Sequence, residues 1–371
     1  MNISRWLLTL GLALLVSACS GKDEAAPTTE VASTATATME AATPPANTPT
    51  PSATQIPRAG VAIVDRFIGA MLTADATELP ALVDYHDVAC EVSPMGIGAP
   101  PPCPPGVPDG TPIRLISGSS CEGYFITAPE AGEQLMSAAQ RGVSVFSASR
   151  LPGGGYAVIL TPPGGGTSQS AAQAIMGAVY RLSERGVVSI AHPCGPSART
   201  TSLQYPDYLI QPPPLPAVPA ATQHTGIAGV DAIIDAVVVR DIATLLARTK
   251  QVEVGCGSDR WLPYCGDQPA GTLIETTEIR QCGDQLWFTR DGMLYDIDYQ
   301  IGPSPTIFAV TRRAEGGYAV VVDARGDPAQ RDGGHAIVVS PEGEILVFDR
   351  GCQQSPQELA ATYTDFVIAP K

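Results

Sequence analysis

The spacing of apolar residues over 58–200 predicts helices first and strands afterwards. Residues 61–73 carry apolar side chains at helical spacing, and Asp75 then stands at the N-cap position of a second short helix. A further helix is expected over residues 129–141. Segments rich in β-branched and apolar residues, separated by glycine turns, predict strands at 112–117, 123–127, 143–150, 156–162, 174–182 and 187–192. This order of elements indicates the α+β class.

The same pattern occurs a second time. Residues 60–90 align with residues 226–256 at a constant offset, and Gly154-Gly155-Tyr156-Ala157-Val158 recurs as Gly316-Gly317-Tyr318-Ala319-Val320. We therefore expect two tandem α+β repeats, 58–200 and 225–371, the second with a polar C-terminal tail. Residues 201–224, which contain a polyproline stretch, are expected to be a stiff linker. The matching elements of the second repeat are strands at 305–313, 317–323, 335–340 and 345–350 and a weaker helix at 291–301.

The N-terminus has the pattern of an export signal. Arg5 supplies positive charge, residues 6–16 form a short apolar run, and small residues precede Cys19. The sequence Val16-Ser17-Ala18-Cys19 resembles the lipobox of bacterial lipoproteins, in which the cysteine is acylated and becomes the first mature residue. Residues 1–19 are then a lipoprotein signal peptide, and the Ala/Thr/Pro-rich residues 20–57 are expected to be a disordered spacer. The resemblance implies a lipid-anchored protein of the cell envelope, on its extracytoplasmic face.

The cysteine count agrees with this interpretation. There are nine cysteines, and after Cys19 is set aside each repeat has four at matching places. An exported chain meets an oxidising compartment, which favours two disulfides per repeat. Four cysteines allow three pairings, of which we favour the one that staples a local loop and closes a long segment. The favoured pairs are Cys90–Cys103, Cys121–Cys194, Cys256–Cys265 and Cys282–Cys352. No Cys-x-x-Cys spacing is present, and His86 and His192 have no histidine counterparts, so we expect no metal site and no cofactor.

The order of elements in each repeat resembles the cone fold of nuclear transport factor two, ketosteroid isomerase and scytalone dehydratase. The Val-Asp…Asp-x-x-x-Leu pattern of the first helices carries the resemblance further. It implies N-terminal helices packed on a curved, mostly antiparallel sheet, with a pocket between helix and sheet. A cystatin-like sheet with a single helix is the nearest alternative.

Six polar residues recur in both repeats and are candidates to line such a pocket. A structural role explains each of them more simply, because first-turn carboxylates favour the helix dipole and exposed arginines pair with acids. No Ser, Cys or phosphate-loop motif is present, and no residue stands out as catalytic. The candidates are Asp65, Arg150 and Tyr156 in the first repeat and Asp231, Arg312 and Tyr318 in the second.

The charge of the chain limits the range of partners. A net charge of −15 repels phosphate backbones, so we expect no nucleic-acid partner. The sequence is most consistent with a membrane-tethered, non-catalytic binding or scaffold module for an unknown protein, glycan or small apolar ligand. An enzyme of the cone-fold type is the alternative. It would be an isomerase, dehydratase or hydrolase with its site in one repeat, and it requires a cavity with converging ionisable groups. Docking of a partner through the loop 91–110 is a third possibility.

Overall fold

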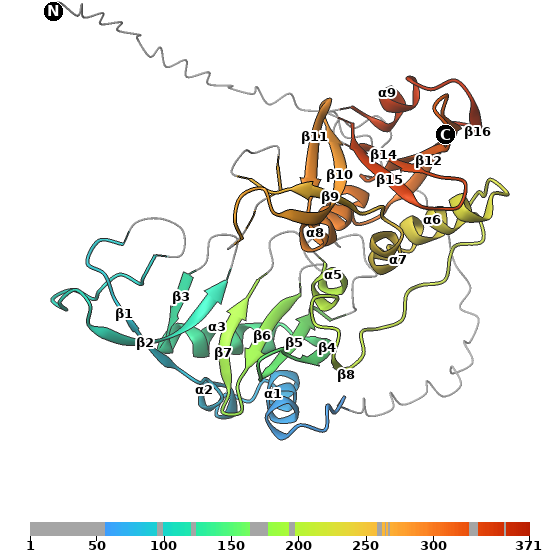
Figure 1. Cartoon of the computed structure of the whole chain (residues 1–371). Helices are drawn as coiled ribbons and strands as arrows, with labels where there is room; N and C mark the ends of the chain where they lie inside the picture. Colours follow the sequence, from blue (N-terminus) through green and yellow to red (C-terminus); the bar gives the residue numbers. More distant parts are fainter. Residues whose placement is uncertain are drawn as a thin grey trace, which may run out of the picture. The chain divides into compact units, whose positions relative to one another are not determined.

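A computed structural model of the chain describes residues 56–94, 99–119, 124–163, 177–192, 197–257, 262, 263, 265, 268–325, 333–351 and 354–371. Residues Gln55–Lys371 form one compact unit. In its described part the strands form two mixed sheets of eight strands each, accompanied by short helices (Figure 1). The predicted α+β class is therefore correct. Cys19 lies outside the described residues.

The first half begins with two helices and then alternates strands with two further helices. The strands and helices agree with the predicted ones within a few residues, and β1, α5 and β8 are additional. The elements are α1 (Ala62–Thr73), α2 (Glu78–Ala81), β1 (His86–Ala89), β2 (Pro112–Ser119), β3 (Tyr124–Thr127), α3 (Ala128–Gln140), β4 (Ser144–Arg150), β5 (Tyr156–Thr161), β6 (Ala178–Leu182), β7 (Val187–Ala191), α5 (Ala198–Ser202) and β8 (Tyr208–Ile210).

The second half repeats this order of elements. Its elements are α6 (Ala228–Val238), α7 (Ile242–Ala247), β9 (Val252–Gly255), β10 (Leu273–Gln281), β11 (Asp284–Phe288), α8 (Arg290–Ile301), β12 (Thr306–Arg312), β13 (Tyr318–Asp323), β14 (Gly334–Val339), β15 (Ile345–Arg350), α9 (Pro356–Ala360) and β16 (Phe366–Ile368).

The two sheets have the same strand order. The first runs β1-β2-β7-β6-β5-β4-β8 with β3 also on β2, and the second runs β11-β10-β15-β14-β13-β12-β16 with β9 also on β10. Most neighbours are antiparallel, but β2 pairs with β7 in parallel and β10 pairs with β15 in parallel. Every element of one half thus has a counterpart at the same place in the other.

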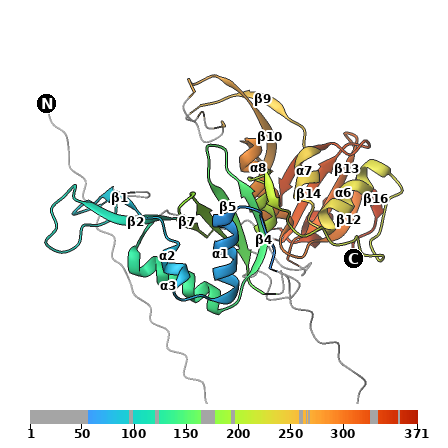
Figure 2. The ribbon, with the colours of Figure 1, turned by 90° about the horizontal axis from the view of Figure 1, so that it is seen from below.

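The first helix of each half packs its apolar face on the sheet. In α1 the residues Ile63, Val64, Phe67, Ile68 and Met71 are buried, and they recur every three or four positions. Helices α1, α2 and α3 cover one face of the first sheet (Figure 2). Each half has its own main apolar cluster, one around α1 and α3 and the other around α6 and α8. Each half therefore buries the helix-facing side of its own sheet.

A glycine fixes the turn that joins the central strands of each half. Gly155 has φ +82°, and a Cβ there would lie 2.5 Å from the carbonyl oxygen of Leu182. Gly317 has φ +73°, and its Cβ would lie 2.6 Å from the carbonyl oxygen of Val339. Both the left-handed backbone and the close approach require glycine. The Gly-Gly-Tyr match between the two repeats is thus explained by a turn conformation that requires glycine.

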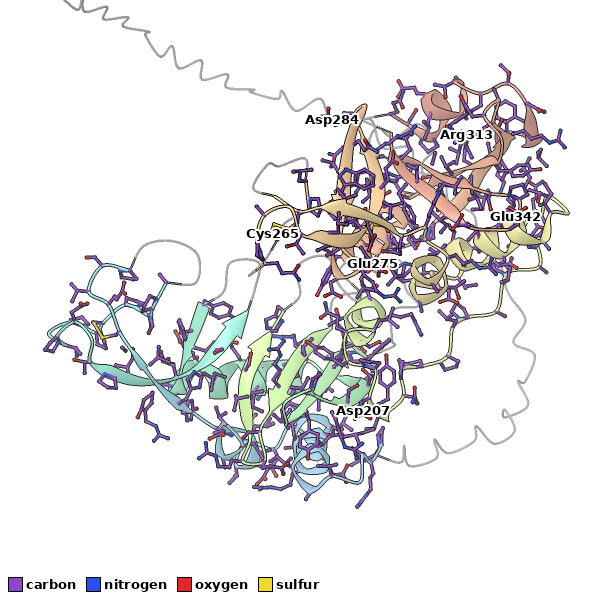
Figure 3. All side chains as sticks on the ribbon, viewed as in Figure 1. Asp207, Cys265, Glu275, Asp284, Arg313 and Glu342 are labelled. Carbon is purple, nitrogen blue, oxygen red and sulfur yellow. A yellow bond between two sulfur atoms is a disulfide. The ribbon has the colours of Figure 1, made fainter. Side chains whose placement is uncertain are left out.

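The segment predicted to be a linker contributes to the first sheet. Within 201–224, strand β8 pairs with β4, as β16 pairs with β12 near the C-terminus. Asp207, labelled in Figure 3, stands beside β8 and lies 3.6 Å from Arg150, and Asp365 lies 3.8 Å from Arg312. Each half therefore continues through a short helix and an edge strand after its main sheet.

Two disulfides staple equivalent loops. Cys90 is bonded to Cys103, and Cys256 is bonded to Cys265, with Cα–Cα distances of 4.9 and 5.0 Å. These are the two short-range pairs favoured by the sequence, and Figure 3 shows sulfur–sulfur bonds in yellow and labels Cys265. Cys282 is also in a disulfide. The other predicted members, Cys121, Cys194 and Cys352, lie outside the described residues. Disulfides indicate an oxidising, extracytoplasmic compartment.

None of the helices in the described part of the chain is both long enough and apolar enough to cross a membrane.

Candidate ligand cavity beside helix α3

Helix α3 begins with a strong local signal. Thr127 is the N-cap, and Glu130 returns to accept hydrogen bonds from the Thr127 backbone N–H at 2.9 Å and from its hydroxyl at 2.7 Å. This capping box satisfies donors at the start of the helix. The same bonds lower the pKa of Glu130. The helix is thereby fixed at one end and packs Ala131, Leu135 and Ala139 into the core of the first half.

A cavity of about 510 Å³ lies beside this helix. Its volume is within the range of small-molecule sites. The lining comes from strand β3, helix α3 and the residue that follows it, strands β6 and β7, and the residue directly after β7. The lining residues are Tyr124, Glu130, Glu133, Gln134, Ser137, Ala138, Arg141, Tyr180, Ile190 and His192.

Two tyrosines form part of the cavity wall. Tyr180 on β6 is 2% exposed, its ring lies 5.0 Å from that of Phe67, and burial raises its pKa to about 12. Tyr124 on β3 lies against Gly118 of β2, where an added Cβ would meet the ring at 2.7 Å. Gly118 therefore makes room for the Tyr124 ring. The cavity thus has two aromatic walls, of which Tyr180 is tightly packed and Tyr124 is 37% exposed.

His192 and Arg141 supply basic groups to the same cavity. Burial lowers the pKa of His192, and the charge of Arg141 lowers it further. The imidazole is therefore neutral at pH 7. Arg141 donates a hydrogen bond to the Ser137 hydroxyl at 2.5 Å. The lining carries two glutamates and one arginine, so with a neutral His192 its net charge is negative.

Gln134 presents an unsatisfied acceptor. Its Oε1 atom is buried, and no hydrogen-bond donor reaches it among the described residues. A buried carbonyl oxygen without a donor costs about 1–3 kcal/mol. Because Gln134 lines the cavity, a bound molecule with an N–H or O–H group could supply the missing donor.

The equivalent place in the second half is filled. Asp296 stands seven residues after the N-cap Thr289, as Gln134 stands seven residues after Thr127. On the sheet, Ile190 pairs with Tyr180 in the same way as Phe348 pairs with Ile337, so Ile190 and Phe348 are equivalent. His192 and Arg350 each stand two residues further along the chain and are therefore equivalent as well. Where the first half has Gln134 and His192, the second half has Asp296 and Arg350.

Arg350 and Asp296 form an ion pair at that place. Gln300 donates to Asp296, Gln281 accepts from Arg350 Nη1 at 2.9 Å, and the guanidinium carbon lies 5.8 Å from the centre of the Phe288 ring. Asp296 is 6% exposed. Burial lowers the pKa of Arg350. The second half therefore fills with its own charged side chains the place that, among the described residues of the first half, is open.

The first-helix aspartates among the predicted pocket residues have structural partners. Asp65 accepts a hydrogen bond from Ala59 N at 2.6 Å. Asp231 accepts from Thr225 N and Oγ1, both at 2.7 Å, and from Gly226 N at 3.0 Å. Both carboxylates tie down the backbone that enters the first helix of their half.

The recurring tyrosines and arginines also lie elsewhere. Tyr156 donates to Glu184 at 2.8 Å, which raises its pKa, and Tyr318 packs against the core of the second half. Arg150 and Arg312 lie beside Asp207 and Asp365 in exposed ion pairs. Among the residues that line the cavity beside α3 and the larger cavity described below, none of the six candidates occurs.

Agreement between the two repeats does not predict the cavity residues. Matching positions mark what both halves need in order to fold, such as the Gly-Gly-Tyr turn. The positions that differ, Gln134 against Asp296 and His192 against Arg350, mark where the halves diverge in chemistry. His192 has no histidine counterpart in the second repeat. That difference between the repeats is the sequence signal that marks this position.

A second, larger cavity of about 970 Å³ has a mainly apolar lining that includes Pro213, Pro214 and Pro305. Each of its guanidinium groups makes at least one polar contact, although the buried Nε of Arg240 has no hydrogen-bond partner among the described residues. Arg199 Nη2 donates to the carbonyl oxygen of Pro213 at 2.5 Å, and Arg240 is paired with Asp298. We take the cavity beside α3 as the candidate for specific recognition because its lining is more polar and holds the unpartnered Gln134 Oε1.

Within the described residues, no group of three or more histidine, cysteine, aspartate or glutamate side chains is arranged to hold a metal ion. Comparison with known proteins found no protein family whose sequence pattern matches the chain and no curated protein that matches it.

Proposed function

We propose that the protein is a lipid-anchored, extracytoplasmic binding protein whose first half holds a small polar molecule in the cavity beside α3. The observation that carries the proposal is the buried, unpartnered Oε1 of Gln134 in a cavity of about 510 Å³. Ligand sites commonly combine apolar walls with a few placed polar groups. Tyr124 and Tyr180 supply walls here, and Gln134, Arg141 and His192 supply polar groups.

The anchor is Cys19, which carries the lipid and is the first residue of the mature chain once residues 1–18 are removed. The spacer 20–57 separates the binding half from the membrane by a root-mean-square distance of roughly 35 Å if it is flexible. The lipobox resemblance supports this part of the proposal, and the disulfides agree with export. A tethered binding protein of this kind samples solutes close to the membrane surface.

We further propose that the two halves arose by duplication of one cone-like unit. The common strand order, the stapled loops and the paired Arg150–Asp207 and Arg312–Asp365 contacts support a common origin. On this view one copy kept an open pocket. In the other copy the Arg350–Asp296 pair filled the pocket, and that copy kept a structural role.

A transplant variant tests the binding function. Gln134→Asp, Ala138→Gln and His192→Arg together place the closing residues of the second half at the matching positions of the first. Thermal shift against a panel of polar metabolites should show stabilising compounds for the mature wild-type chain and none for the triple variant. If the triple variant is folded and is stabilised by the same compounds, the cavity beside α3 is not the site.

The enzyme alternative keeps one specific support. The cavity is lined by both His192, whose pKa is lowered, and the buried Tyr180, whose pKa is raised, and a catalytic site requires such ionisable groups with altered pKa values. Mass spectrometry of a bound compound after prolonged incubation separates the two functions. A compound that is recovered unchanged supports binding, and one that is converted by the wild type but not by His192→Asn supports catalysis.

A further inference from the structure

The second half shows what chemical group fits this place in the fold. The guanidinium of Arg350 is held there by the carboxylate of Asp296, by the amide oxygen of Gln281 and against the ring of Phe288. A planar group with several N–H donors is thus recognised by acceptors from helix α8 and strand β10, next to an aromatic ring from strand β11.

The first half has an acceptor at one position of this arrangement, that of Asp296, and lacks the arginine. Gln134 Oε1 stands at the position of the Asp296 carboxylate and has no donor among the described residues. Strand β3, the counterpart of β11, contributes the ring of Tyr124 to the lining, although Ile126 and not Tyr124 stands at the position of Phe288. His192 replaces the arginine with a shorter side chain.

We propose that the ligand of the cavity beside α3 carries a guanidinium-type group, which occupies the place that Arg350 fills in the second half. This inference rests on the proposed binding function and names its ligand class. Gln134 Oε1 accepts from the planar N–H groups, and the tyrosine rings provide faces for the cation.

The electrostatics of the cavity permit such a cation. Glu133 and Glu130 line the cavity against the single charge of Arg141, which already donates to Ser137. The net negative lining favours a cationic group over an anionic one.

The test uses methylguanidinium as the probe and methylammonium and methylurea as comparisons, with calorimetry on the mature chain. Methylguanidinium should bind most tightly. Gln134→Glu should tighten its binding about fivefold, because a carboxylate forms charge-assisted hydrogen bonds, and Gln134→Leu should weaken it at least tenfold. Gln140→Leu, on the exposed end of the same helix, is the matched control and should leave affinity unchanged.

The outcomes separate this inference from the proposed function. If methylguanidinium binds no better than methylammonium, or Gln134→Glu does not tighten it, the guanidinium assignment is wrong. The binding function still stands in that case if panel metabolites stabilise the wild type and fail to stabilise the triple variant. If no compound of either set binds, both proposals are wrong.

Discussion

At the scale of single residues, His192 makes stability depend on pH with a definite sign. Its pKa in the folded chain is lowered from the ordinary value of about 6.5, so near this value the unfolded chain binds more protons. We expect stability to fall as pH decreases below about 6.5. Urea unfolding between pH 5 and 8 should show a weaker dependence of the free energy of unfolding on pH in His192→Asn.

His224 is paired with Asp235, and this pairing raises the pKa of His224, which changes stability with pH in the opposite direction. The test is therefore the difference between wild type and variant in the slope of the free energy of unfolding against pH. Identical slopes would contradict the lowered pKa of His192.

The Arg350–Asp296 pair gives a second prediction at this scale. Arg350→Ala leaves a buried carboxylate without its cation, and the loss should be about 3–5 kcal/mol in the free energy of unfolding. The double variant Arg350→Met with Asp296→Leu removes both charges and should lose much less. Urea unfolding measures both, and equal losses would show that packing rather than the ion pair holds this place.

At the scale of elements, the entry to the first helix differs between the halves in a testable way. Asp231 accepts three hydrogen bonds from Thr225 and Gly226, whereas Asp65 accepts one from Ala59. Asp231→Ala should therefore destabilise by about 1–2 kcal/mol and Asp65→Ala by less. Comparison of the two variants in urea unfolding checks the order, and a larger loss for Asp65→Ala would contradict it.

The elements that sequence reasoning found are those with a strong local signal. Helices α1 and α3 and the central strands of each half have clear periodicity or capping, as with Thr127 and Glu130. Strands β8 and β16 are three residues long and form only because β4 and β12 offer an edge. The cavity was not predictable from matching positions, because it depends on side chains that converge from α3, β3, β6 and β7 after folding.

At the scale of the whole molecule, the anchor and the staples predict a specific mass. Intact mass spectrometry of membrane-extracted protein should show a chain that begins at Cys19 with a lipid attached. Reduction should add eight hydrogens, two for each of four disulfides. Cys19→Ala should lack the lipid mass and be lost from the membrane fraction. A wild-type chain without lipid would contradict the proposed anchor at Cys19.

The cavity beside α3, which is open among the described residues of the first half where Arg350 and Asp296 fill the second half, is proposed to hold a ligand. Native mass spectrometry of the mature chain mixed with a polar metabolite extract tests it most directly. The account predicts one small molecule per wild-type chain and none on the folded variant Gln134→Asp, Ala138→Gln, His192→Arg. Two molecules per chain, none on the wild type, or equal occupancy of wild type and variant would contradict it.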